Sequence, residues 1–410
     1  MKKVCKIRFY PNKTQIKIIN ETLGACRFVY NKFLEFNIKA YHDGKPFISG
    51  YEFSKKLNKR KKTDPDYMWL SDYSSKAIKD EIMTAEKAYK RFFKEKKGFP
   101  RFKSKKSPVN SFFFIKDNIS FETGNKNIIK IPILGKIRIT ERDYLPDEKL
   151  VSSGRVIKKG DNYYVSFIYE SSVKQGKLSK YGCGIDLGIK DFAIIHFKNG
   201  YNFKCSSFLS DKQVKIYSER IEKLQRIISK KAEINYGKLL CRYTDKRPTE
   251  DINEKLKNIM KGESYNTSQI RKLRKKINRA YEKKVNYIRE KIKYYVNSLV
   301  IAKPKYITIE DLSIQNMLQS DTDSIHKYIQ ESRWYYFRNY LMNKCHEYGI
   351  ELRVTNKFMK SSRTCSKCGY VNDKLKLSDR VFICPECGLE IDRDINAAIN
   401  LCNTKKYHVI

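Results

Sequence analysis

The chain has 410 residues, and its 86 Lys and Arg residues against 45 Asp and Glu give a formal net charge of +41. Because 40% of the residues are hydrophobic, this composition excludes a disordered basic tail and favours a globular protein of two or three domains that binds a polyanion such as nucleic acid. No segment reaches the roughly 18 apolar residues of a membrane span, and seven of the eleven cysteines occur singly. We therefore expect a reducing, cytoplasmic location.

The N-terminal third begins with an expected strand at residues 4–10 and continues into helices. Asn12 and Gln15 have the spacing of a capping pair, and apolar residues then recur every three or four positions up to the Asp43-Gly44 turn. Further helical patterns cover residues 51–57 and 74–96. We expect these helices to form one lobe.

Residues 98–106 interleave aromatic side chains with cations in the run Gly-Phe-Pro-Arg-Phe-Lys-Ser-Lys-Lys. Aromatic rings can stack on bases while cations neutralise phosphates, so Arg101, Lys103, Lys105 and Lys106 are candidate nucleic-acid contacts. The alternative is a solvated loop that two buried phenylalanines hold in place.

From residue 109 to 172 the pattern changes to the period of two that is typical of strands. The expected strands are residues 112–116, 128–133, 136–140, 155–158 and 163–169, with a hairpin turn at 159–162. We predict a small antiparallel barrel that closes with the N-terminal strand and contains the helices of residues 12–96 as an insertion. The polar residues 174–180 mark a domain boundary.

Beyond this boundary, Gly-Ile-Asp-Leu-Gly places Asp186 within a buried apolar strand, and two further strands at residues 191–197 and 200–204 complete a meander. A carboxylate is costly to bury unless it is paired or bound to a metal. The same motif also begins the first strand of sugar kinases and chaperone ATPases, which keeps an ATPase open as an alternative.

Two long amphipathic helices occupy most of residues 210–300, and the polar stretch 235–266 joins them. Their narrow apolar seams predict an antiparallel helical hairpin, and a dimerising coiled coil is the alternative. A short strand at residues 305–312 then ends in a second carboxylate, Glu310, and a helix at 324–348 and a strand at 350–355 follow.

The C-terminal part contains the array Cys-x2-Cys-x15-Cys-x2-Cys, formed by Cys365, Cys368, Cys384 and Cys387. This is the spacing of a four-thiolate zinc site, and a glycine after each pair permits the tight turn that points amides at sulfur. Seven residues later Asp394 lies at an expected helix start, where Ala397 and Ala398 permit close packing. The array alone is typical of a structural zinc finger, but the hairpin also delivers a carboxylate.

Three carboxylates stand out: Asp186 on a first strand, Glu310 on a later strand and Asp394 at a helix start. They are far apart in the sequence, so only the fold could bring them together. Two Mg²⁺ ions held by such acids would activate water for phosphodiester hydrolysis, because Mg²⁺ prefers oxygen ligands. Taken singly, each acid is more often a helix cap or a salt-bridge partner.

These motifs resemble the TnpB family of insertion-sequence nucleases, which are related to compact type V CRISPR effectors. The resemblance rests on Gly-Ile-Asp-Leu-Gly, Ile-Thr-Ile-Glu-Asp-Leu, the two cysteine knuckles and Asp-Arg-Asp-Ile-Asn-Ala-Ala-Ile-Asn, together with residues 27–33 and 98–106. It implies a mixed α/β and α+β fold and assigns the family's acid triad to Asp186, Glu310 and Asp394. Arg27 begins one of the matching segments and is a further candidate nucleic-acid contact. The resemblance does not identify the residues that read the flanking DNA motif, and our own candidates for that role are Ser75 and Lys76.

The implied domains are a wedge β-barrel with an inserted helical recognition lobe, and a RuvC-like (ribonuclease-H-like) nuclease domain interrupted by a zinc ribbon for target nucleic acid. In chain order they are the first barrel strand 1–11, the helical lobe 12–97, the rest of the barrel 98–173, a linker 174–180, the nuclease domain 181–360 with the helical hairpin 210–300, the zinc ribbon 361–390, and the last nuclease motif and tail 391–410.

The implied function is RNA-guided DNA cleavage by a nucleoid-associated prokaryotic protein. A monomer would carry one guide RNA from the transposon end, one structural Zn²⁺ and two catalytic Mg²⁺ ions, and would recognise a short flanking motif on double- and single-stranded target DNA. The alternatives are a cleavage-silent RNA-guided DNA-binding regulator and a transposase.

Overall fold

The structure of the protein is a computed structural model. In helix α5 (Lys212–Tyr243) the backbone is described throughout, and the side chains are described as far as Lys231. The described residues are 2–95, 98–105, 108–117, 119–121, 127–141, 145–172, 176–188, 190–208, 210–243, 267–311, 332–356, 359–376 and 379–410. Lys106, the hairpin connection 244–266 and the first part of the helix expected at 324–348 lie outside them. The chain divides into two compact units, Met1–Ser172 and Val173–Ile410, at the start of the expected linker.

The first unit is built on an antiparallel sheet of order β2-β5-β6-β1-β4-β3. Its strands are β1 (Lys2–Tyr10), β2 (Ser111–Ile115), β3 (Ile128–Ile131), β4 (Gly135–Ile139), β5 (Val151–Lys159) and β6 (Asn162–Glu170). The N-terminal strand β1 lies inside the sheet, and its Cys5, Ile7 and Phe9 point into the core. Edge strand β3 is bridged through Lys130 to Ser120, which follows the other edge strand β2, so full closure of the barrel stays a prediction.

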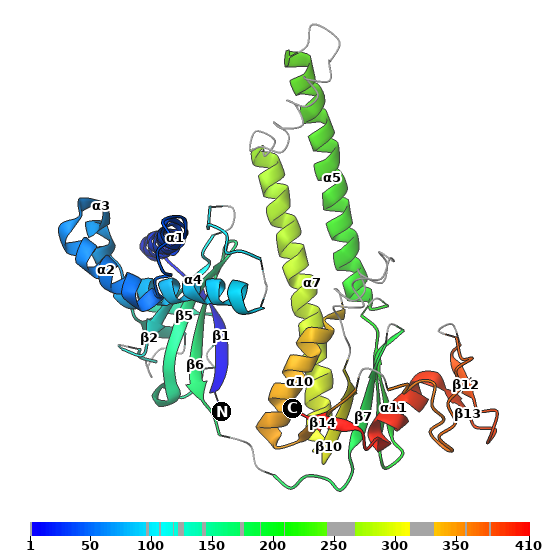
Figure 1. Ribbon diagram of the computed structural model, residues 1–410. Coiled ribbons are helices and arrows are strands. Elements are labelled where there is room, and N and C mark those ends of the chain that lie inside the picture. Colours follow the sequence, from blue (N-terminus) through cyan, green and yellow to red (C-terminus); the bar gives the residue numbers. More distant parts are fainter. Residues whose placement is uncertain are drawn as a thin grey trace. The chain divides into compact units, whose positions relative to one another are not determined.

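Helices α1 (Lys13–His42), α2 (Gly50–Thr63), α3 (Pro65–Met68) and α4 (Ser75–Glu95), with the 3-10 turn η1 (Trp69–Asp72), are inserted between β1 and β2 (Figure 1). The expected capping box is present, with Asn12 accepting from the Gln15 amide at 2.8 Å. Gln15 also donates to the Leu134 and Lys136 carbonyls, so the cap ties α1 to the sheet. The helix expected at 51–57 extends to Thr63.

The second unit contains a mixed sheet of order β14-β11-β10-β7-β8-β9. Its strands are β7 (Cys183–Leu187), β8 (Asp191–Phe197), β9 (Asn202–Ser206), β10 (Tyr306–Glu310), β11 (Glu351–Thr355) and β14 (Tyr407–Val409). Strands β7 to β9 form the expected antiparallel meander, and β10 and β11 run parallel to β7. Strands β12 (Val381–Ile383) and β13 (Glu390–Asp392) form a separate hairpin.

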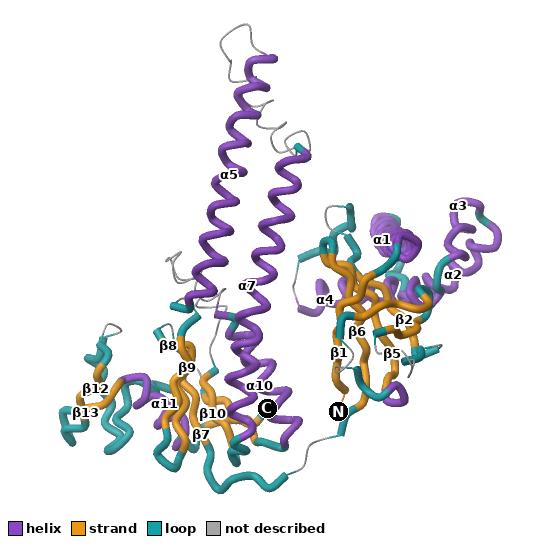
Figure 2. Tube along the Cα trace, turned by 180° about the vertical axis from the view of Figure 1, so that it is seen from behind, coloured by secondary structure: helices purple, strands orange, loops and turns teal. Residues whose placement is uncertain are grey.

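Helices α5 (Lys212–Tyr243), α7 (Ser268–Ile301), α10 (Trp334–Tyr348) and α11 (Arg393–Asn403) complete this unit. Alternate residues of β7 and β10, including Ile185 and Ile309, pack with α7 and α10 in one core. Because successive strand residues point to opposite faces, Gly184 and Asp186 face the other side, which α11 covers (Figures 1 and 2).

The helices α5 and α7 lie side by side as the predicted hairpin (Figure 1). Their seam is filled within the chain by Ile221, Ile277 and Ala280, with Leu224 and Ile228 beside them. Within the described side chains, this apolar seam is therefore covered inside the chain, as the predicted antiparallel hairpin requires. Each helix in the described part of the chain is too short or too polar to cross a lipid bilayer.

Glu81 on α4 is a buried acid in the core of the first unit, with 5% of its surface exposed. Burial raises the pKa of Glu81 from 4.5 to about 7, an effect that Arg155 opposes and Asp80 supports. The folded chain therefore holds this proton to a higher pH than the unfolded chain does. Stability contributed by the protonated form is lost as pH rises through the range from 4.5 to about 7.

We predict that Glu81→Gln, which stays neutral at every pH, removes this loss. The difference in unfolding free energy between the variant and the original chain should shift in favour of the variant by on the order of 3 kcal/mol when the pH is raised from about 5 to about 8. Chemical denaturation at both pH values measures it. Glu86→Gln is the control, because it removes an ion pair with Lys90 from the same helix and should cost similar stability at both pH values. Parallel pH profiles for Glu81→Gln and the original chain would contradict the prediction.

Candidate functional site

Asp186 and Glu310 lie on neighbouring parallel strands at the same edge of the sheet. Ile185 pairs with Ile309 in the β7–β10 register, and each acid is the next residue along its strand. Both side chains therefore leave the sheet toward α11, at the carboxyl ends of the strands, where sites on open α/β sheets are found.

Helix α11 approaches β7 so closely that only glycine fits at position 184. A Cβ atom there would overlap the Ala398 carbonyl oxygen and the Cys402 amide nitrogen. Tyr306 on β10 also donates its hydroxyl to the Cys402 carbonyl at 3.1 Å, which fixes the far end of the helix. The expected close packing through Ala397 and Ala398 is thus present, and its partner is β7.

Asp394 lies in the first turn of α11, where a negative charge is favoured by the helix dipole. Asp392, the last residue of β13, caps the helix by accepting from the Asp394 and Ile395 amides at 3.0 and 3.2 Å. Lys204 on β9 lies 3.3 Å from the other Asp392 oxygen. The cap therefore holds the start of α11 against both the meander and the hairpin.

The three carboxylates influence one another electrostatically. Burial, and next the charges of Asp394 and Glu310, hold the pKa of Asp186 well above its usual range, while Arg393 opposes the shift. Burial also raises the pKa of Glu310. Within the described residues, neither Asp186 nor Glu310 accepts a hydrogen bond or forms an ion pair, whereas Asp394 contacts Arg393 at 3.3 Å.

This site thus concentrates negative charge that the described side chains only partly neutralise. Its donors are all carboxylate oxygens, the set preferred by hard divalent cations. The three acids do not form a tight single-ion cluster: among the described residues, only the four cysteines have ligand atoms that all lie within 4.8 Å of one another.

The four cysteines form the predicted cluster and could hold a zinc ion. Sulfur atoms lie 3.6 Å apart between Cys365 and Cys387 and 3.5 Å apart between Cys368 and Cys384, close to the roughly 3.8 Å edge of a tetrahedral thiolate site. Burial tends to raise the pKa of Cys365, but amide hydrogen bonds from Cys368 and Lys367, together with hydrogen bonds from the Cys368 and Cys387 thiols, lower it to about 7.

The glycine after each knuckle has the positive φ that the turn requires, +81° at Gly369 and +68° at Gly388. In each knuckle the glycine amide donates to the carbonyl of the first cysteine at 3.0 Å. The two halves of the site therefore repeat one backbone geometry, as the sequence predicted.

Asn396 and Asn400 connect the cysteine hairpin to α11, a role that the sequence analysis missed. Asn396, which is fully buried, donates to the Thr364 carbonyl at 2.7 Å and accepts from the Ser366 amide at 3.0 Å. Asn400 donates to the Ser361 and Thr364 carbonyls at 2.8 and 2.6 Å. Two asparagines four residues apart on one helix face were the available signal.

The candidate nucleic-acid residues lie in the first unit. Four of them are exposed: Ser75 and Lys76 at the start of α4, and Arg101 and Lys105. Lys103 and Arg27 are half-buried, and Arg27 lines a cavity of about 400 Å³ together with Trp69. The acids and the cysteines belong to the second unit.

The segment around residues 98–105 is held by Asn31 rather than by buried phenylalanines. Phe99 and Phe102 are 47% and 52% exposed, so the alternative of a loop fixed by two buried rings is wrong. Instead, the Asn31 side chain exchanges hydrogen bonds with the backbone of Lys103 at 2.8 and 2.9 Å. The Phe99 ring also packs edge to face against Tyr89 and Phe92 of α4, with ring centres 5.5 and 5.2 Å apart, and about half of its surface stays exposed.

Two family models match the chain. One is described as "Cas12f1-like, TNB domain" and matches residues 334–401, which include the cysteine hairpin and most of α11. The other is described as "Helix-turn-helix domain" and matches residues 1–46, which form β1 and α1 here.

Curated relatives match between about three fifths and nearly all of the chain. A "Putative RNA-guided DNA endonuclease" of Streptomyces pristinaespiralis is 25% identical over 98% of this chain and 89% of its own length. The "Putative RNA-guided DNA endonuclease InsQ" of Escherichia coli is 24% identical over 97% of this chain and 90% of its own length. The "TnpB-like protein aq_aa05" of Aquifex aeolicus is 24% identical over 62% and 77%, respectively.

We predict that Gly184→Ala forces α11 away from β7 and costs about 1–3 kcal/mol of stability or more, measured by chemical denaturation. The added methyl group meets the helix backbone, which cannot rotate away as a side chain can. Gly24→Ala on α1 is the control, because its Cβ meets nothing within 4 Å, and it should stabilise slightly. A Gly184→Ala chain as stable as the original would show that the contact between β7 and α11 leaves room for a methyl group.

We also predict that Asn396→Ala loosens residues 361–366. Loss of two buried hydrogen bonds should cost about 1–3 kcal/mol locally and speed amide hydrogen exchange in this segment by about tenfold or more. Exchange followed by mass spectrometry measures it, with exposed Asn403→Ala as the control on the same helix. Unchanged exchange in the Asn396 variant would mean that the hairpin does not depend on α11.

Proposed function

This chain belongs to the TnpB family, and on that premise we propose that it is an RNA-guided DNA endonuclease of an insertion sequence. The observation that carries the proposal is the convergence of Asp186, Glu310 and Asp394 from β7, β10 and α11. The names of the full-length relatives support the same activity.

Asp186, Glu310 and Asp394 would hold two Mg²⁺ ions. When bound, such ions supply an activated water and stabilise the leaving oxygen of the phosphodiester. The fit rests on a donor set made only of carboxylate oxygens and on the raised pKa of Asp186, which burial and the neighbouring acids cause. Placing all three acids on strand ends and a helix start keeps them in position before substrate arrives.

We infer a RuvC-like, ribonuclease-H-like nuclease domain for residues 181–360 and 391–410. The antiparallel meander β7–β9 next to parallel β10 and β11 supports this inference. We also infer a wedge β-barrel with an inserted helical lobe in the first unit, supported by the six-stranded antiparallel sheet that α1 to α4 interrupt.

We infer that residues 361–390 are a zinc ribbon that binds target nucleic acid, with Cys365, Cys368, Cys384 and Cys387 as ligands. The chain would act as a monomer with one guide RNA from the transposon end, at the nucleoid of a prokaryotic cell. Base pairing with the guide would select the DNA, and the protein would read the short flanking motif. The net charge of +41 supports polyanionic partners.

We predict that Asp186→Asn abolishes guide-dependent cutting while guide-dependent DNA binding persists. Loss of one metal-holding carboxylate should slow cleavage by at least about 10³-fold. The test is to purify the chain with its cellular RNA, sequence that RNA, and add matched double-stranded DNA with randomised flanks and Mg²⁺. Glu219→Gln, an exposed acid on α5, is the control and should cut normally.

The same experiment separates the alternatives. Tight guide-dependent binding without cutting by the original chain would indicate a regulator, and strand joining would indicate a transposase. Absence of any bound RNA would contradict the RNA-guided function.

A further inference from the structure

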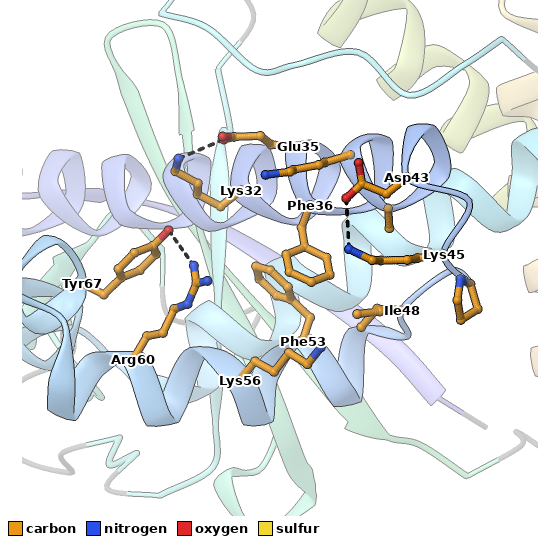
Figure 3. A pocket seen from close by; sticks show the side chains of 13 residues that line it. Lys32, Glu35, Phe36, Asp43, Lys45, Ile48, Phe53, Lys56, Arg60 and Tyr67 are labelled. Atoms are coloured by element: carbon orange, nitrogen blue, oxygen red, sulfur yellow. Dashed lines mark hydrogen bonds and ion pairs between the residues drawn. The ribbon is translucent and has the colours of Figure 1, made fainter.

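The helical lobe contains a cavity of about 580 Å³ that none of the candidate sites above includes. It lies between α1 and α2, with α3 at one end (Figure 3). Its volume falls within the roughly 300–1,000 Å³ that is typical of ligand pockets.

The wall of this cavity is aromatic. Phe36 from α1 and Phe53 from α2 meet edge to face, with ring centres 5.8 Å apart and ring planes inclined at 66°, and Tyr67 lies farther along (Figure 3). Phe53 is buried and Phe36 is half-buried, so the Phe36 ring is partly open to the cavity. A flat ring of a ligand can pack against such a surface without displacing a core side chain.

The rim of the cavity is cationic. Lys32 pairs with Glu35 at 2.9 Å and Lys45 pairs with Asp43 at 3.2 Å, which neutralises both acids in the lining. The other three lining cations, Lys39, Lys56 and Arg60, form no ion pair within the described part of the chain.

Two of these unpaired charges lie beside the rings. The Lys56 ammonium lies 5.1 Å from the Phe36 ring centre, and the Arg60 guanidinium lies 5.3 Å from that of Tyr67, whose hydroxyl it also contacts (Figure 3). A ligand that combines a flat apolar ring with a neighbouring anion would therefore satisfy the wall and the rim together.

We propose that this cavity binds one unstacked nucleotide of a single-stranded nucleic acid. The base packs on Phe36 beside Phe53, and the flanking phosphates contact Lys39, Lys56 and Arg60. Single strands fit because a base within a duplex cannot leave its stack to reach the ring without a cost in energy. This binding requires neither the acids nor a guide, so it stands independently of the cleavage proposed above.

The test uses the full-length chain, freed of co-purified nucleic acid, and a fluorescent eight-nucleotide oligouridylate followed by anisotropy without Mg²⁺. Phe36→Leu keeps the apolar volume but removes the ring, and should weaken binding about fivefold or more. Lys56→Ala should also weaken binding and reduce the salt dependence by about one phosphate contact. Lys55→Ala is the matched control, because this exposed neighbour on α2 does not line the cavity, and its affinity should be unchanged.

Ultraviolet crosslinking of the same oligonucleotide, mapped by mass spectrometry, should label peptides that contain Phe36, Phe53 or Tyr67. Equal loss of affinity in Lys55→Ala and Lys56→Ala, or crosslinks only outside the cavity, would overturn the proposal. Displacement of the oligonucleotide by an octaglutamate peptide, with Phe36→Leu unaffected, would also overturn it and indicate an acidic-peptide site.

Discussion

The contact between α11 and β7 positions the candidate catalytic site of the second unit. Gly184 lets the backbone of α11 approach the strand, and the side chain two residues later on the same face is Asp186. The parallel register with β10 adds Glu310 at the same level, and the first turn of α11 adds Asp394. Three acids that are far apart in the chain thus meet because one helix packs without an intervening side chain.

The cysteine hairpin is part of this arrangement rather than a separate module. Its last strand, β13, ends in the Asp392 cap of α11, and its first knuckle is hydrogen-bonded to Asn396 and Asn400. Order imposed by zinc at the cysteines would therefore extend to the start of α11 and to Asp394. The cysteine cluster and the acidic site are connected through one helix, since a shift of the hairpin would displace the Asp392 cap.

Local signals predicted what depends on local chemistry. The Asn12 capping box, the knuckle glycines and the meander around Asp186 are each set by residues close in sequence, and each is present. The extension of α2 to Thr63 was missed because its last turn is mostly cationic and lacks an apolar period. The exposure of Phe99 and the Asn396 contacts depend on partners that are distant in sequence, which no local pattern specifies.

The most direct test of the account is to measure Mn²⁺ binding to the zinc-loaded full-length chain by electron paramagnetic resonance, with Asp394→Asn alongside. Mn²⁺ is a probe for the hard-cation site because it prefers the same oxygen ligands as Mg²⁺. We predict saturable binding that Asp394→Asn weakens by at least about tenfold, since this acid is the ligand that the helix, rather than the sheet, contributes to the site. Equal binding by both chains would contradict the claim that α11 completes the site.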